Sequence, residues 1–327
     1  MPDPKTNIVY MGTPEFAVAP LKALLDGGFN IIAVVTAPDK PAGRGKKMQS
    51  SAVKIFAESR GIKILQPEKL KDPVFLDVLR TLKPGLQIVV AFRMLPKEVW
   101  SLPALGTFNL HASLLPRYRG AAPINHAIMN GEKESGVTTF FIDDKIDTGK
   151  ILFREKVPIP GNYTAGDLHD KLMVTGASLV VKTTKAIISG DWKEIPQDSL
   201  IKPGEILHTA PKIFKEDCKI NWNLDGQRIH NFIRGLSPDP AAYSWLKEPA
   251  GKTIHVKIYN SDFINAVHDL SPGNLVIPDK KTLYVAVKDG YISLHSLQLE
   301  GKNKVDAVSF LNGFRDVKNA ILLKRFF

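Results

Sequence analysis

Asn7–Ala37 reads NIVYMGTPEFAVAPLKALLDGGFNIIAVVTA, and this stretch decides the fold. Residues 7–12 and 30–37 are short, nearly continuous apolar runs, which are typical of strands buried on both faces. Residues 14–28 between them carry apolar side chains at helical spacing and end in two glycines, a helix stop signal. A strand, a helix and a second apolar strand form a βαβ unit, which predicts a parallel sheet covered by helices.

The same alternation continues along the chain and changes character near residue 190. Further strands are expected at 62–65, 86–92, 107–111, 136–143 and 150–159, and a long amphipathic helix at 164–191. After residue 208, one helix (225–236) precedes short alternating strands separated by Gly, Pro, Asp and Asn turns. We therefore expect an α/β, Rossmann-like domain with a mostly parallel sheet over 1–190, a linker over 191–207, and a small OB-like antiparallel β-barrel domain over 208–327.

Composition restricts the class of protein. The chain has 327 residues and a net charge of +11, which favours a polyanionic partner only weakly. A single cysteine, Cys218, excludes an intrachain disulfide framework, and no Cys/His cluster has zinc-site spacing. No signal peptide precedes the first strand, and no apolar run approaches the roughly 20 residues of a membrane span. These features predict a cytoplasmic protein without a membrane partner.

The stretch "GTFNLHASLLPRYRG" (106–120) places two polar side chains in an apolar strand. Asn109 and His111 stand two residues apart, so they share a face at the carboxyl end of that strand, where α/β sheets place their sites. Asp143, Asp144 and Asp147 follow another predicted strand. An amide, an imidazole and a carboxylate that converge there suit acyl transfer. From spacing alone, satisfied buried polar groups are the commoner explanation.

Two basic loops flank this stretch. The loop between residues 37 and 54 is unusually long for a βα connection and contains Lys40, Arg44, Lys46 and Lys47. Arg117, Tyr118 and Arg119 directly follow the polar strand. Clustered cations beside an aromatic ring suit phosphates or an RNA backbone. A solvated loop, helix capping and surface ion pairs are the alternatives.

Taken together, several motifs resemble the formyltransferase family that uses 10-formyltetrahydrofolate. They are "GTPEFA", "PDKPAGRGKK", "FNLHASLLPRYRGAAPI", "IDTGKIL", "INW", "IRGLSP" and "LQLEGKNKVDAVSFLNG", in the family's order and spacing over essentially the whole chain. The resemblance makes Asn109, His111 and Asp147 the catalytic residues. It implies no metal and no covalent enzyme intermediate. Lys145 and Ile146 stand where many members have Gly-Leu, so a positive φ there is in question.

The resemblance also implies binding residues. The folate cosubstrate is expected against Ser113, Leu114, Leu115 and Pro116, and against the apolar loop with Phe92, Arg93, Met94 and Leu95, which matches the family by position more than by identity. Transfer RNA is expected against Lys40, Arg44, Lys46, Lys47, Arg117 and Arg119, with Arg44 foremost, and against the C-terminal barrel.

The acceptor of the formyl group separates the branches of the family. The long basic loop and the second domain favour methionyl initiator tRNA over a nucleotide-linked amino sugar or a purine-pathway amine. The resemblance and the lack of an obvious apolar seam favour a monomer. A non-catalytic RNA-binding protein on the same scaffold is the alternative from another class, and the intact Asn, His and Asp argue against it.

Overall fold

The computed structural model describes residues 6–42, 47–247, 251–313 and 321–322. By compactness the chain divides into two units. Unit 1 comprises Met1–Gly120, Glu134–Pro158 and His169–Ala210, and unit 2 comprises Ala121–Lys133, Ile159–Leu168 and Pro211–Phe327. The predicted boundaries at residues 190 and 208 divide the chain in sequence, whereas each unit combines several chain segments. These boundaries stay a prediction.

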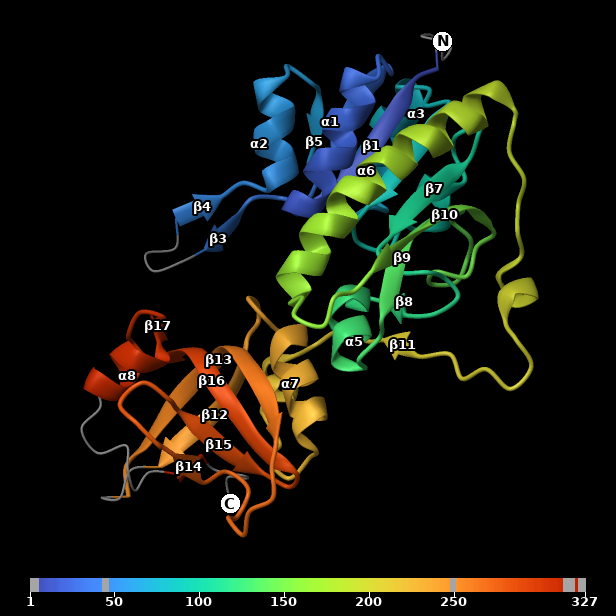
Figure 1. Ribbon diagram of the computed structural model, residues 1–327. Helices are drawn as coiled ribbons and strands as arrows, with labels where there is room; N and C mark the ends of the chain where they lie inside the picture. Colours follow the sequence, from blue (N-terminus) through green and yellow to red (C-terminus); the bar gives the residue numbers. More distant parts are fainter. Residues whose placement is uncertain (1–5, 43–46, 248–250, 314–320, 323–327) are drawn as a thin grey trace. The chain divides into compact units, whose positions relative to one another are not determined.

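Unit 1 is built on a seven-stranded sheet in the order β10-β9-β7-β6-β1-β2-β5 (Figure 1). Neighbouring strands from β7 to β5 are parallel, whereas β9 is antiparallel to β7 and β10 to β9. The mostly parallel, Rossmann-like sheet is therefore confirmed. Its strands are β1 (Ile8–Gly12), β2 (Ile31–Val35), β5 (Ile64–Leu65), β6 (Leu86–Val90), β7 (Thr107–His111), β9 (Glu134–Phe141) and β10 (Ile151–Pro158).

Helices cover both faces of this sheet. On one face, α3 (Pro73–Thr81) and α4 (Lys97–Trp100) form an apolar cluster with Val9, Met11 and Val35. On the other face lie α1 (Val18–Asp26) and α6 (Ala165–Ser189), and α2 (Ala52–Ser59) contacts α1 and β2 (Figure 1). Burial on both faces explains why the strand sequences are continuously apolar.

Helix α6 departs from the expectation that no segment could span a membrane. Among the described residues it is the one helix that is long and apolar enough to do so by length and composition. Its apolar side has a partner in the protein, because Leu168, Leu172, Leu179, Val180 and Ile187 are buried. Thr183 also exchanges a hydrogen bond of 2.8 Å with Thr139 of β9. These contacts are those of a core helix.

Short elements surround the sheet. In the long basic loop, β3 (Lys40–Ala42) pairs with β4 (Lys47–Gln49), and β8 (Arg119–Gly120) pairs with β11 (Thr209–Ala210). The segment 191–207, expected to be a linker, packs on unit 1: Ile195 bridges Ile151 of β10, and a 3₁₀ helix, η2 (Gln197–Leu200), follows. This segment shows no periodicity, so its sequence does not reveal that it is packed.

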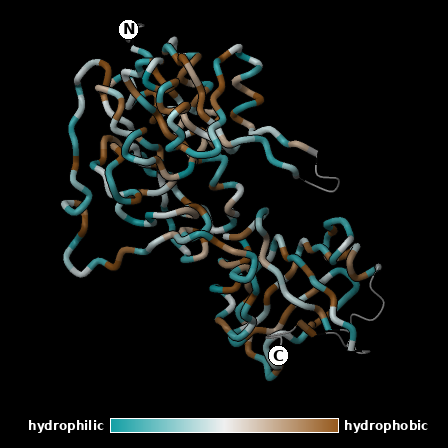
Figure 2. Tube along the Cα trace, turned by 180° about the vertical axis from the view of Figure 1, so that it is seen from behind, coloured by the Kyte–Doolittle hydropathy of each residue, from teal (hydrophilic) through white to brown (hydrophobic). Residues whose placement is uncertain are grey.

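Unit 2 contains an antiparallel sheet in the order β14-β15-β16-β13-β12-β18, with β17 beside β16. A bridge between Asn274 and Ile321, and a 2.9 Å hydrogen bond from the Leu322 N–H to the Gly273 carbonyl, join the two ends and close a barrel. Figure 2 shows hydrophobic and hydrophilic residues alternating along its strands. The elements are α5 (Pro123–Met129), α7 (Gly226–Gly235), β12 (Ala242–Lys247), β13 (Thr253–Asn265), β14 (Leu275–Val276), β15 (Tyr284–Val287), β16 (Gly290–Leu299), β17 (Val305–Asp306), α8 (Ala307–Gly313) and β18 (Ile321–Leu322).

Candidate active site

His111 ends β7 and is 6% exposed. Its Nε2 lies 2.9 Å from the Tyr118 carbonyl oxygen, which can only accept, so Nε2 carries a proton. Its Nδ1 lies 3.7 Å from Oδ2 of Asp147. Nδ1, the other ring nitrogen, therefore faces the Asp147 carboxylate.

Asp147 lies in the turn between β9 and β10 and has a φ of 54°. Its Oδ2 accepts a 2.9 Å hydrogen bond from the Gly120 N–H. The positive φ of this turn therefore falls on Asp147 itself and not on Lys145 or Ile146. Because the backbone segment 118–120 contacts both His111 and Asp147, it fixes the two side chains relative to each other.

The two other acidic residues of the turn have different roles. Asp143 Oδ1 accepts hydrogen bonds from the Lys145 N–H (3.0 Å) and the Thr148 hydroxyl (2.7 Å), which shape the turn. Asp144 is exposed. Of the three predicted carboxylates, the structure brings only Asp147 to His111.

Asn109 lies two residues before His111 on the same face of β7, and it pairs with Val89 of β6 and Phe140 of β9. Its side chain is half-buried. Within the described part of the chain its amide has no hydrogen-bond partner, so both its N–H₂ and its carbonyl can serve a ligand. This observation removes the structural explanation, a satisfied buried amide, for Asn109.

The segment predicted to contact folate turns its side chains inward. The Ser113 hydroxyl donates to the Arg117 carbonyl (2.7 Å), and Leu115 packs with Phe140 and Ile151. Pro116 is buried and Leu114 is half-buried. A ligand at this segment would meet the backbone more than the side chains of Ser113 and Leu115.

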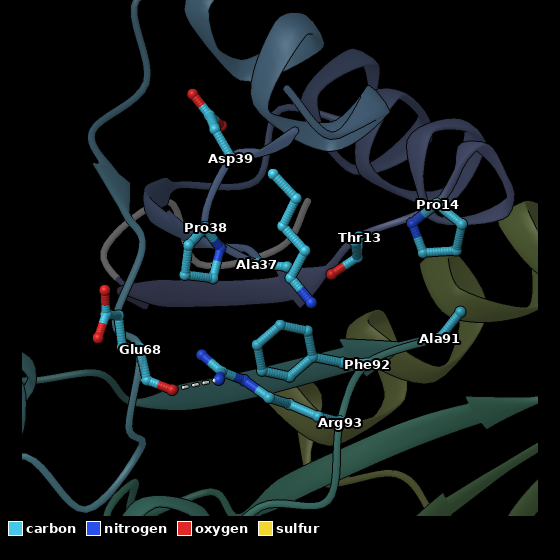
Figure 3. A pocket seen from close by; sticks show the side chains of 10 residues that line it. Thr13, Pro14, Ala37, Pro38, Asp39, Glu68, Ala91, Phe92 and Arg93 are labelled. Carbon is cyan, nitrogen blue, oxygen red and sulfur yellow. Dashed lines mark hydrogen bonds between the residues drawn. The ribbon is translucent and has the colours of Figure 1, made fainter. Parts of the chain in front are cut away.

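A pocket of about 670 Å³ opens at the carboxyl ends of β1, β2 and β6 (Figure 3). Phe92 and Arg93 face Pro38 across it. Arg93 donates a hydrogen bond of 2.7 Å to the Glu68 carbonyl oxygen. Thr13, Pro14, Ala37, Asp39, Lys40, Glu68 and Ala91 complete the wall. Two other members of the predicted loop lie elsewhere: Met94 is 67% exposed, and Leu95 belongs to the apolar core beneath the sheet.

Charges along the pocket wall are partly neutralised. Lys54 Nζ lies 2.5 Å from the Asp39 carboxylate, and Gln66 donates to the same group at 2.9 Å. The hydrogen bond from Lys54 is the largest cause that lowers the pKa of Asp39. Burial lowers the pKa of Arg93, and its Nε has no hydrogen-bond partner within the described residues. The pocket therefore presents a half-buried guanidinium beside an aromatic ring, with the Arg93 Cζ 5.4 Å from the centroid of the Phe92 ring.

The predicted phosphate-binding cations have mixed placements. Lys40 lines the pocket, Arg44 and Lys46 lie outside the described residues, and Lys47 is placed by its backbone in β4. Arg117 pairs with Glu205 at 2.6 Å, and Arg119 binds the side chain of Gln197. The Lys202 N–H and then Arg117 lower the pKa of Glu205. Both arginines thus hold loops of unit 1 together.

Gln197 is a residue that the sequence does not reveal as part of the site. It lies in the segment interpreted as a linker, is 3% exposed, and binds the turn that carries Asp147. No motif or periodicity marks it.

Among the described residues, no group of three or more His, Cys, Asp or Glu side chains could hold a metal ion, and the prediction of metal-free chemistry stays a prediction.

Comparison with known proteins agrees with the fold class. Residues 6–184 match the Formyl transferase family and residues 212–315 the Formyl transferase, C-terminal domain family. A Bacteroides fragilis protein named methionyl-tRNA formyltransferase is 53% identical over 308 residues, covering 94% of this chain and 95% of its own. One of the same name from Azobacteroides pseudotrichonymphae is 52% identical over 326 residues and 99% of each chain. The crystal structure of a sugar 3N-formyl transferase, in the presence of dTDP and 5-N-formyl-THF, has a TM-score of 0.62 and 24% identity, covers 91% of this chain and 99% of its own, and shows the common fold.

Proposed function

The chain belongs to the formyl transferase family, and we propose that it transfers the formyl group of 10-formyltetrahydrofolate to the free α-amine of methionyl initiator tRNA. The product would be N-formylmethionyl-tRNA for translation initiation. The observation that carries the proposal is the pairing of His111 with Asp147 on the same edge of the sheet as the Asn109 amide, which has no hydrogen-bond partner among the described residues. The names of relatives more than half identical over nearly the whole chain support the choice of acceptor.

In the proposed reaction, the α-amine attacks the formyl carbon and the bond between that carbon and N10 breaks. The amine proton passes, through water, to the departing N10. The developing oxyanion is stabilised by the Asn109 N–H₂ and by the imidazolium of His111. Removing one such donor typically costs 10²–10³-fold in kcat, because the donors are already oriented before charge develops.

The geometry supports a specific role for each ring nitrogen of His111. Nε2 is engaged by the Tyr118 carbonyl, so Nδ1 is the nitrogen that would face the reacting atoms. At 3.7 Å, the Asp147 carboxylate lies beyond hydrogen-bond distance but close enough to stabilise the positive charge. Asp147 would thus support the imidazolium without taking its proton.

The two substrates are proposed to bind to adjoining surfaces, which meet at Lys40 in the pocket wall. The folate is placed against the Ser113–Pro116 backbone and the Phe92–Leu95 loop, where Phe92 and Arg93 line the pocket. The tRNA is placed along the basic loop, with Lys40 and Arg44, and along unit 2. Because charged tRNA is found in the cytoplasm, the proposal includes a cytoplasmic enzyme, and we propose that it is a monomer, which light scattering of the purified protein would test.

The test is a formylation assay with 10-formyltetrahydrofolate and methionyl initiator tRNA, run beside uncharged tRNA and a nucleotide-linked amino sugar. Of these three acceptors, we expect only methionyl initiator tRNA to be formylated. Asn109→Ala, His111→Ala and Asp147→Asn should each lower kcat about 10²-fold or more, with circular dichroism unchanged. Asp144→Asn, an exposed acid of the same turn, is the matched control and should keep wild-type activity. A near wild-type rate for His111→Ala, or preference for the amino sugar, would overturn the proposal.

A further inference from the structure

The side-chain amide of Gln197 is fully used at the turn that carries Asp147. Its Nε2 donates to the carbonyl oxygens of Asp147 (2.9 Å) and Gly149 (2.8 Å). Its Oε1 accepts from Arg119 twice, from Nε at 3.0 Å and from Nη2 at 2.6 Å. Both N–H groups and both lone pairs are therefore occupied in a nearly water-free position, 3% exposed. Satisfied buried polar groups of this kind fix the groups that they join.

Asp147 benefits from such support because its φ of 54° lies in the left-handed region, which Asp tolerates better than most residues but which still costs free energy relative to the right-handed region. The Gly120 N–H holds its carboxylate, and Gln197 holds its carbonyl. The residue next to Gly120 is Arg119, which binds the other end of the Gln197 amide. The contacts form a closed circuit from the strand segment 119–120, through the side chain of Gln197, to the backbone and carboxylate of Asp147.

We propose that Gln197 is a positioning residue for the reaction, which sets the distance between the Asp147 carboxylate and Nδ1 of His111. The inference rests on the proposed function, since it assigns a part in the same chemistry. Gln197 acts through the backbone of Asp147 and, within the described residues, makes no hydrogen bond to His111 or Asn109, so it shapes the charge pair without taking part in the bond changes. Segment 195–200 is then a wall of the active site that comes from outside the sheet.

Two substitutions separate the two ends of the amide. Gln197→Met keeps the length of the side chain and removes every hydrogen bond. Gln197→Glu keeps an acceptor for Arg119 but places a carboxylate oxygen against the carbonyl oxygens of Asp147 and Gly149. Asp198→Asn, an exposed neighbour in the same 3₁₀ helix, is the matched control. Each variant is first checked by circular dichroism and thermal unfolding, and if Gln197→Met does not fold, Gln197→Glu carries the test.

Steady-state kinetics with both substrates is the first readout. Both Gln197 variants should lose at least ten-fold in kcat while the KM values for folate and tRNA stay within about three-fold, because binding surfaces remain and only the charge pair is displaced. Asp198→Asn should match wild type. A wild-type kcat in either folded Gln197 variant, or a loss that appears in KM alone, would overturn the proposal.

A second readout does not depend on the substrate. In protein labelled with ¹⁵N-histidine, the ring signals of His111, identified by their loss in His111→Ala, should shift in Gln197→Met and stay in place in Asp198→Asn. Unshifted signals would overturn the positioning role. If wild-type protein gave no formylated tRNA while these signals still shifted, the acceptor assignment would fail and the positioning of Asp147 would stand.

Discussion

Gly149 closes the turn that begins at Asp147, and its replacement by alanine tests how tightly that turn is held. A Cβ atom at this position would lie 1.6 Å from the Phe141 carbonyl oxygen and 2.8 Å from its carbonyl carbon. Real Cβ contacts essentially never fall below 3.0 Å, so the backbones would have to separate by 1.4 Å, the difference between 3.0 and 1.6 Å. The Phe141 N–H donates to the Lys150 carbonyl at 3.0 Å, so this separation disrupts the start of the β9–β10 ladder.

The expected cost is at the upper end for overpacking, about 3 kcal/mol in the free energy of unfolding. For a unit of this size, about 3 kcal/mol corresponds to a fall in Tm of roughly 6–12 °C. The kcat should fall as well, because Asp147 lies two residues away and Gln197 binds the carbonyl of Gly149 itself.

Thermal unfolding followed by circular dichroism, together with the formylation assay, measures both effects. Gly161→Ala is the control, since its Cβ would meet no heavy atom within 4 Å. The control should keep its Tm within about 2 °C of wild type. A Gly149→Ala protein with wild-type Tm and kcat would refute the steric reasoning.

Three further outcomes are expected. Raising the salt concentration from about 50 to about 200 mM should raise the KM for tRNA at least ten-fold and leave the KM for folate nearly unchanged, because phosphate contacts release counterions; an unchanged tRNA KM would contradict the role of the basic loop. Ser244→Ala leaves the buried Trp222 N–H, now 3.0 Å from the Ser244 hydroxyl, without an acceptor, so denaturant titration should show a loss of about 1–3 kcal/mol; a loss below about 0.5 kcal/mol would contradict this. Burial lowers the pKa of His255, which contacts the rings of Tyr243 and Trp245. Because the folded state disfavours the charged ring, protonation of His255 destabilises the folded protein. The contribution of the neutral ring to the free energy of unfolding is complete above the unfolded pKa of about 6.5 and is lost as the pH falls below it. The Tm of wild type should thus fall more steeply from pH 7.5 to 5 than that of His255→Phe, and equal slopes would count against this.

The sheet of unit 1 could be predicted because its strands are buried on both faces. Continuous apolar runs mark β1 and β2, and mostly apolar runs mark β6 and β7. Gly or Pro marks the ends of the helices between them. The barrel was harder to predict in detail. Strand β12 follows two prolines and was not predicted, and β18 is two residues long in the described chain, too short to leave a pattern.

The sequence likewise predicts only some of the residues of the candidate site. Asn109 and His111 attract attention because polar side chains interrupt an apolar strand. The groups that hold Asp147 cannot be found in this way, because they are backbone atoms of residues 118–120 and one amide in a segment without periodicity. Hydrogen bonds between residues as distant in sequence as Gln197 and Asp147 depend on tertiary packing, which local sequence does not encode.

Closure of the barrel in unit 2 has a consequence for biosynthesis. Until residues 321–322 have been made, Leu246 and Lys247 at the end of β12, and residues 273–274 before β14, form short edges without their strand partner. Such edges pair readily with other chains, so a truncated or nascent unit 2 is exposed to aggregation that the finished barrel avoids. Deleting β18 should therefore lower the yield of soluble protein by leaving two open edges, although it removes no residue assigned to the reaction.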